Sequence, residues 1–317
     1  MHTETLTQTK VCVEKEGEPV AEIEIRDVGP RDGLQGESPV APSDRAALCV
    51  ALADAGVPHV EAASFVSPRA VPSMAGGDVV VAELPERENV TWWALVPNAR
   101  GAEMALAAGV RHITVTISAS DGYSRKNVGR STEEAVASLA EIGNTVGDQA
   151  ELDVVVSCAF GSPFDDVAGP APVAGICART LATLPAARLT LADTTGTATP
   201  RRIGAVLDAL DPEARSDLGL HLHDTRGTAL SNALAAIDLG MTRFDTATGG
   251  LGGSPFAPGA GGNLATEDLV LVLDDLGHTT GIDLGAILAI ARGLPGLVGH
   301  AMPSRVSAAG PLPRFGT

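Results

Sequence analysis

The chain has 317 residues, of which 44% are apolar and only 3% aromatic, so its core is built mainly from aliphatic side chains. The formal net charge of −17 excludes nucleic acid and anionic membranes as expected partners, because a surface of that sign repels phosphate. The length suits either two average domains or one α/β barrel.

The cysteines and the N-terminus indicate a cytoplasmic protein. Cys12, Cys49, Cys158 and Cys177 show neither a Cys-x-x-Cys spacing nor a disulfide framework, so we expect reduced thiols. Residues 1–20 are polar and more acidic than basic, unlike a signal or transit peptide, and we expect them to form a flexible arm. No apolar run approaches the roughly 20 residues that span a bilayer, so no membrane partner is expected.

From residue 22 onward, short β-branched runs alternate with longer amphipathic runs. We expect eight strands, at residues 23–28, 59–63, 91–96, 112–117, 152–158, 188–192, 218–222 and 243–248. Helices are expected at residues 44–55, 99–108, 132–144, 173–184, 201–210, 228–239 and 266–275. This alternation predicts a (β/α)8 TIM barrel at residues 21–281, with a doubly wound sheet as the alternative. Residues 282–317 are expected to form a C-terminal helical extension that caps the barrel or pairs protomers as a homodimer.

The segments after the first two strands carry charged side chains at the ends where barrel enzymes place their active sites. Gly29-Pro30-Arg31-Asp32-Gly33 reads as a tight loop that presents a cation beside a carboxylate. Asp32 is a candidate metal ligand, and Arg31 could stabilise a developing oxyanion, although a surface ion pair is the simpler alternative. Glu61 in the second strand would be a buried carboxylate that orients Arg31.

Two further groups follow strands four and six. Residues 118–130 read as a basic, hydroxyl-bearing loop, in which Ser124, Arg125, Lys126 and Asn127 could contact the phosphates of an acyl-CoA; a solvated loop is the alternative. Asp193, at the end of strand six, could bind substrate, support a metal ligand, or cap the following helix.

His221 and His223 project to the same face of strand seven, because strand side chains alternate with period two. Two imidazoles at the end of one strand can share a cation, or can be polar groups satisfied by hydrogen bonds. The glycine-rich segment 248–264 fits a flexible lid better than a phosphate cradle. Asn263 at its end is either a helix N-cap or a metal ligand, and propensity alone favours the cap.

In combination, these motifs resemble the 3-hydroxy-3-methylglutaryl-CoA lyase family of metal-dependent TIM-barrel carbon–carbon lyases and synthases. The resemblance runs from about residue 22 to 276 and rests on four motifs: Gly-Pro-Arg-Asp-Gly-Leu-Gln, Ser-Phe-Val-Ser-Pro, His-x-His-Asp-Thr, and Gly-Gly-Leu-Gly-Gly-x-Pro followed by Gly-Asn-Leu-Ala-Thr-Glu-Asp.

The resemblance implies a ligand set and a reaction. Mg²⁺ or Mn²⁺ would be held by Asp32, His221, His223 and Asn263. The substrate would be 3-hydroxy-3-methylglutaryl-CoA or a close 3-hydroxyacyl-CoA analogue, whose hydroxyl proton passes to His221 or Asp32 before a retro-Claisen cleavage. Arg31 would meet the charge of the thioester enolate, and the products would be acetyl-CoA and a keto acid. Glu61 would hold Arg31, and Asp193 would orient the substrate.

One position departs from the family pattern. The glycine-rich loop of these lyases carries a cysteine where this chain has Ser254, and a serine, with its higher pKa, cannot act as the same acid. Ser254 could donate a weaker proton or a hydrogen bond. A Claisen-type condensing enzyme or aldolase on a related substrate, and an inactive homologue that binds an acyl-CoA, are therefore the alternative functions.

Overall fold

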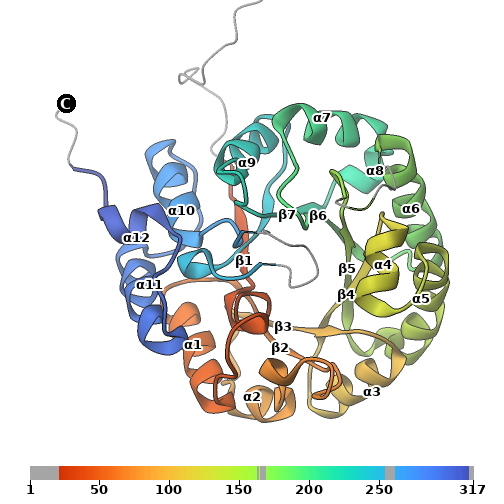
Figure 1. The fold of residues 1–317 in the computed structure, drawn as a ribbon, viewed down its shortest axis with the longest axis horizontal. Coiled ribbons are helices and arrows are strands. Elements are labelled where there is room, and N and C mark those ends of the chain that lie inside the picture. The colour runs from red at the N-terminus through yellow and green to blue at the C-terminus, as the bar shows by residue number, and fades with distance from the viewer. Residues whose placement is uncertain (1–20, 163, 165–168, 254–260, 314–317) are drawn as a thin grey trace, which may run out of the picture.

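Eight parallel strands form a closed barrel in a computed structural model that describes residues 21–162, 164, 169–253 and 261–313 (Figure 1). Each strand pairs with the next along the chain, and β8 closes the barrel on β1. The strands are β1 Glu24–Asp27, β2 His59–Ser64, β3 Thr91–Val96, β4 His112–Ser118, β5 Glu151–Ser157, β6 Arg188–Asp193, β7 Leu218–Leu222 and β8 Arg243–Thr246. The predicted (β/α)8 TIM barrel is confirmed.

A ring of helices surrounds the barrel. They are α1 Pro42–Asp54, α2 Gly77–Glu83, α3 Ala99–Ala107, α4 Asp121–Val128, α5 Thr132–Val146, α6 Pro170–Thr183, α7 Pro200–Ala209, α8 Pro212–Arg215, α9 Ala229–Asp238, α10 Thr266–Asp275, α11 Leu284–Val298 and α12 Arg305–Ala309. Single turns occur at η1 Gly29–Gly33, η2 Pro72–Met74, η3 Gly147–Gln149 and η4 Thr248–Gly250. None of the helices in this described part of the chain is long and apolar enough to cross a membrane.

Local signals explain where several helices begin. Before α5, Ser131 accepts a hydrogen bond from the Glu134 backbone while the Glu134 carboxylate accepts one from the Ser131 backbone, which satisfies two otherwise unpaired donors. Before α7, the Thr199 side chain accepts from the Arg202 backbone, and Pro200 occupies the first helical position, where its missing N–H costs nothing.

The segment after β4 is a correction to the sequence analysis. Residues 118–130 were expected to form a loop, whereas α4 occupies most of the segment. The Ser120 side chain caps its start by accepting from the Tyr123 backbone, and Gly129, with a φ of 69°, ends it in the left-handed conformation. The eight residues of α4 are mostly polar, so apolar periodicity gives no sign of a helix there. The short helix α2 was also not predicted.

The C-terminal helices lie against the barrel's outer ring. Helix α11 packs on α1 and α10, and α12 packs on α10 and α11 (Figure 1). The Asp268 carboxylate of α10 accepts hydrogen bonds from the Ser304 hydroxyl and from the Val306 backbone, both at 2.9 Å, which anchors α12. The predicted arm 1–20 lies outside the described residues, as do residues 314–317 of the predicted extension.

Aliphatic side chains fill the space between the strands and the helices, whereas buried charges occupy part of the barrel interior. Ile25, Val154 and Leu220 are fully buried in the core. Arg26 of β1 reaches Asp153 of β5 across the barrel, with 2.8 Å between Nη1 and Oδ2. Branched aliphatic residues usually fill this space in such barrels, so this chain holds an unusual ionic layer there.

Candidate metal site and active site

A π-helical turn directly after β1 brings Arg31 and Asp32 to the mouth of the barrel. The backbone N–H groups of Arg31, Asp32 and Gly33 all donate to the Val28 carbonyl, at 3.2, 2.7 and 3.1 Å. π-helical turns are rare in proteins overall, and those that occur are often found at functional sites. A Cβ at position 29 would lie 2.8 Å from the Asp27 carboxylate, so any residue other than glycine there would force that side chain to shift.

His221 and His223 lie beside Asp32. The two Nε2 atoms are 3.1 Å apart, and His221 Nε2 is 3.9 Å from Asp32 Oδ2. One ligand atom from each of the three residues lies within 4.8 Å of the others. Ligands of an octahedral Mg²⁺ ion lie about 3 Å apart when adjacent and about 4 Å apart when opposite, because each is about 2.0–2.1 Å from the ion. The three side chains therefore fit a divalent cation.

Asn263 lies beside this cluster, and its predicted alternative as a helix cap is wrong. Helix α10 has Ala265 as its N-cap residue, two positions later. The Asn263 amide nitrogen donates to Asp32 Oδ2 and to the Leu251 carbonyl, both at 2.9 Å. Its Oδ1 atom is buried and has no hydrogen-bond partner among the described residues. A buried, unpaired oxygen beside two imidazoles and a carboxylate can serve as a fourth protein ligand.

The electrostatics of the cluster suit a cation. Burial lowers the pKa of His223, and the nearby His221 lowers it further, to about 4, so His223 is neutral near pH 7 and offers a lone pair. For Asp32, burial raises the pKa, but the charges of Arg31, His221 and His223 outweigh it and hold the pKa at about 2. Burial also lowers the pKa of His221, but its hydrogen bond to Asp245 and the charge of Asp32 outweigh this, so that pKa is raised.

Arg31 is held by two carboxylates. Its Nε donates to Glu61 Oε2 at 2.5 Å and its Nη2 also contacts that oxygen, while Nη1 donates to Asp32 Oδ1 at 2.7 Å. Glu61 is fully buried and Arg31 is 7% exposed. The contact between Arg31 and Glu61 agrees with the expected orienting role, and the surface ion pair considered for Arg31 is wrong.

A cavity of about 410 Å³ opens from the cluster into the barrel, within the range of small-ligand pockets. Arg31, Glu61, Asp32, His221 and His223 lie on its wall. Many other lining residues are small or apolar, including Leu95, Thr116, Val155, Ser157 and Ala192, while Gln35, Asn98, Asn127, Arg130 and Asp245 add polar and charged groups. The acyl part of a substrate could therefore reach the cluster from the mouth of the barrel.

The four residues predicted to contact coenzyme A lie on α4 in different environments. Asn127 lines the cavity. Ser124 is only 1% exposed, Arg125 donates to Asp121 at 2.7 Å on the surface, and Lys126 lies 5.6 Å from the centre of the Phe164 ring. Contact of these four residues with coenzyme A stays a prediction.

Asp193 holds the turn after β6. Its Oδ1 accepts from the Thr197 backbone at 2.7 Å, and its buried Oδ2 has no partner in the described chain. Burial raises the pKa of Asp193. Its expected role in orienting substrate stays a prediction, since the neighbouring Ala192 and Thr194, rather than Asp193, line the cavity. Ser254 lies outside the described residues.

Three acidic residues of this region were missed in the sequence. Asp27 accepts hydrogen bonds from the Gly29 backbone, the Thr248 backbone and the Thr248 and Thr266 hydroxyls, and so joins the segments that follow β1 and β8. Glu267 accepts from the Gly249 backbone at 3.0 Å. Asp245 contacts His221. The only feature of the sequence that could have indicated these three residues is that each acidic side chain lies within or next to an apolar run.

Glu267 predicts a specific dependence of stability on pH. Burial raises the pKa of this carboxyl to about 7 in the folded protein. The folded state therefore binds this proton more tightly than the unfolded chain, so Glu267 destabilises the fold progressively as the pH rises from about 4.5 to 7. We expect Glu267→Gln to raise the free energy of unfolding relative to wild type at pH 8 by about 3 kcal/mol, and by little at pH 5.

Thermal unfolding at pH 5 to 8 measures this difference. Glu141→Gln is the matched control, because residue 141 is exposed on α5; its difference from wild type should change little with pH. A pH-independent difference for Glu267→Gln would contradict the prediction.

Comparisons with known proteins agree with this geometry. The HMGL-like family model matches residues 22–293. An (R)-citramalyl-CoA lyase of Chloroflexus aurantiacus is 43% identical over 303 residues, covering 92% of this chain and 95% of the relative. A hydroxymethylglutaryl-CoA lyase of Pseudomonas mevalonii is 39% identical, covering 90% and 96%. The structure of an HMG-CoA lyase from Acinetobacter baumannii in complex with coenzyme A and 3-methylmalate matches with a TM-score of 0.87 at 36% identity, over 93% of this chain and 97% of that one.

Proposed function

This chain belongs to the HMGL-like family, and we propose that it is a divalent-metal-dependent lyase that cleaves a 3-hydroxyacyl-CoA to acetyl-CoA and a keto acid. The proposal rests on one observation: Asp32, His221 and His223 lie together on the wall of a cavity that Arg31 also lines.

Asp32, His221, His223 and the Asn263 amide oxygen would hold Mg²⁺ or Mn²⁺, since oxygen ligands mixed with imidazole suit both ions. The bound cation would lower the pKa of the substrate hydroxyl. The unpaired Asn263 oxygen and the neutral His223 support this ligand set.

The chain's own residues supply the remaining steps. The hydroxyl proton passes to Asp32, or to His221, which could accept it only at Nε2, the nitrogen that would otherwise hold the cation; both residues line the cavity. The carbon–carbon bond then breaks and negative charge develops on the thioester oxygen of an enolate, whose carbon takes back a proton from the protonated base to give acetyl-CoA. Arg31 meets that charge, and Glu61 holds the guanidinium in place, so that little reorganisation is needed as the charge forms.

The relatives act on two different acyl groups, and both fit the proposal. Citramalyl-CoA carries its carboxylate directly on the carbon that bears the hydroxyl, whereas hydroxymethylglutaryl-CoA has one more CH₂ group between them. Cleavage therefore gives pyruvate from the first and acetoacetate from the second, with acetyl-CoA from both. One methylene changes specificity by roughly 10- to 200-fold in a hydrophobic pocket, so one of the two should be clearly preferred.

The test supplies both thioesters in equal amounts to the Mg²⁺- or Mn²⁺-loaded protein and identifies the products by mass spectrometry. We expect acetyl-CoA with pyruvate or acetoacetate, and the ratio of keto acids gives the preference. A Ser254→Cys variant is assayed beside the wild type, and a parallel incubation with acetyl-CoA and a set of keto acids measures condensation. Metal binding without cleavage of either thioester would contradict the proposal.

A further inference from the structure

The two ring nitrogens of His221 face different surroundings. Its Nε2 points into the cluster, 3.1 Å from His223 Nε2. Its Nδ1 points the other way, 3.2 Å from Asp245 Oδ2 on the neighbouring strand β8. A neutral imidazole carries one proton, and the hydrogen bond made by one nitrogen decides whether the other offers a lone pair.

Asp245 is fixed by Arg26, its register partner on the neighbouring strand β1. Arg26 donates from Nε to Asp245 Oδ1 at 2.8 Å and from Nη2 to Oδ2 at 3.0 Å, a two-point pair that requires an acceptor at both positions. The third nitrogen of Arg26 lies 2.8 Å from Asp153 Oδ2, and the guanidinium lies over the Trp93 ring with 5.0 Å to its centre. Arg26 and Asp245 are 5% and 6% exposed, so the pair is screened little by water.

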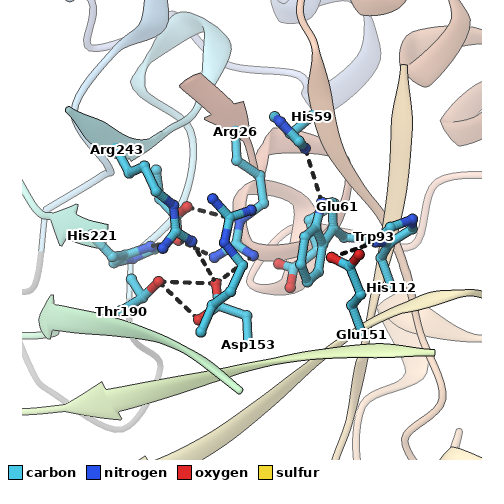
Figure 2. Close-up of polar contacts among 12 residues, drawn as sticks. Arg26, His59, Glu61, Trp93, His112, Glu151, Asp153, Thr190, His221 and Arg243 are labelled. Atoms are coloured by element: carbon cyan, nitrogen blue, oxygen red, sulfur yellow. Dashed lines mark hydrogen bonds and ion pairs between the residues drawn. The ribbon is translucent and has the colours of Figure 1, made fainter. Parts of the chain in front are cut away.

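Figure 2 shows Arg26 of β1 and Asp153 of β5 pointing toward each other inside the barrel, with His221 nearby on β7, one strand removed from each. Arg243 and Thr190 hold Asp153 in turn: Arg243 Nη2 lies 3.4 Å from Asp153 Oδ2, and the Thr190 hydroxyl donates to the same oxygen at 2.9 Å. A continuous set of buried contacts thus runs from the ionic layer to His221.

We propose that Asp245, fixed by Arg26, is a positioning residue that keeps the proton of His221 on Nδ1 and so presents the Nε2 lone pair to the metal. The proposal deepens the proposed function and rests on it. Metal-bound histidines commonly donate their other ring N–H to a carboxylate, which fixes both the tautomer and the ring orientation.

The Arg26 contacts make Asp245→Asn a sharp test. The amide oxygen of asparagine can satisfy only one of the two Arg26 donors, and its NH₂ group must occupy the other position. If the NH₂ group takes the Oδ1 position, it faces the Arg26 Nε–H donor and finds no acceptor there. At the Oδ2 position it can instead donate to His221 Nδ1. We therefore expect the His221 proton to move to Nε2, where it blocks the lone pair that faces the cluster.

The experiment compares Asp245→Asn with Asp153→Asn, a matched change in the same layer that contacts Arg26 and not His221. Titration calorimetry with Mn²⁺ measures metal affinity. Nitrogen-15 NMR of histidine-labelled, metal-free protein at alkaline pH reports which ring nitrogen is protonated. We expect Asp245→Asn to weaken Mn²⁺ binding by about 10- to 100-fold and to move the proton to Nε2. For Asp153→Asn, we expect less than about a threefold change in Mn²⁺ affinity and no change in the protonated nitrogen.

A third variant guards against misfolding. Arg26→Met combined with Asp245→Asn removes both charges of the pair, so no unpaired buried cation remains. Without Arg26 the amide is free to turn its oxygen toward Nδ1, and we expect this double variant to bind Mn²⁺ more tightly than Asp245→Asn alone.

Two results would overturn the proposal. In the first, Asp245→Asn keeps the His221 proton on Nδ1 and binds Mn²⁺ as tightly as the wild type; in the second, Asp153→Asn weakens Mn²⁺ binding as much as Asp245→Asn does. The NMR measurement needs no metal. Wild-type protein that binds no Mn²⁺ would thus refute the proposed function, while the tautomer would still decide the role of Asp245.

Discussion

Replacement of His223 by alanine is expected to abolish binding of Mg²⁺ and Mn²⁺ and to lower the cleavage rate by roughly 10³-fold or more. A cation that stabilises developing charge contributes several kcal/mol to the transition state, and each 1.4 kcal/mol is about tenfold in rate. His223 Nε2 lies 3.1 Å from His221 Nε2. The His223 ring is neutral near pH 7 and can bind a cation without first losing a proton, so the alanine variant loses a ready metal ligand.

Titration calorimetry and a product assay measure both effects on purified His223→Ala. His300→Ala is the matched control, since His300 is exposed and contacts Glu37 at 3.0 Å, away from the cluster. This control should bind metal and turn over as the wild type does. Metal affinity and turnover of His223→Ala at wild-type values would remove His223 from the ligand set.

Replacement of Arg31 by glutamine is expected to lower kcat by about 10²- to 10³-fold, the usual loss when one preorganised donor to a developing oxyanion is removed. Metal affinity should not weaken, because the variant removes a positive charge that lies 2.7 Å from Asp32. The separation of these two effects distinguishes Arg31 from the ligands.

The double variant with Glu61→Gln tests the pair. Glu61 acts through Arg31, so Glu61→Gln should lower kcat in the wild-type background and change it little once Arg31 is glutamine. Arg100→Gln, on the exposed face of α3 beside Glu103, is the matched control. Unchanged kcat in Arg31→Gln, or additive losses in the double variant, would contradict the assigned roles.

The barrel was predictable because its elements repeat. All eight expected strands are present, and β3 and β7 match the predicted limits at both ends. Each strand carries its own signal in a short β-branched run, which needs no knowledge of its partners. Helix α4 was missed because its eight residues lack an apolar stripe and begin at a cap that also fits a loop.

The candidate site was predictable only where neighbouring residues carry the signal. Asp32, His221 and His223 were predicted from a loop and a strand, and the structure brings them together. Asn263 shows the limit of local propensity: a cap was favoured, yet its backbone bridges to His223 and its side chain contacts Asp32. Asp245 was missed because its partner Arg26 is 219 positions away, and no local pattern reveals that pair.

The most direct test of a metal-dependent lyase is acetyl-CoA release before and after removal of metal. Protein treated with a chelator and dialysed is assayed with citramalyl-CoA and hydroxymethylglutaryl-CoA, then reloaded with Mg²⁺ or Mn²⁺ and assayed again. We predict that acetyl-CoA release from at least one thioester is lost with the metal and returns with it. Equal release from metal-free and reloaded protein would contradict the assignment of Asp32, His221, His223 and Asn263 to a catalytic cation.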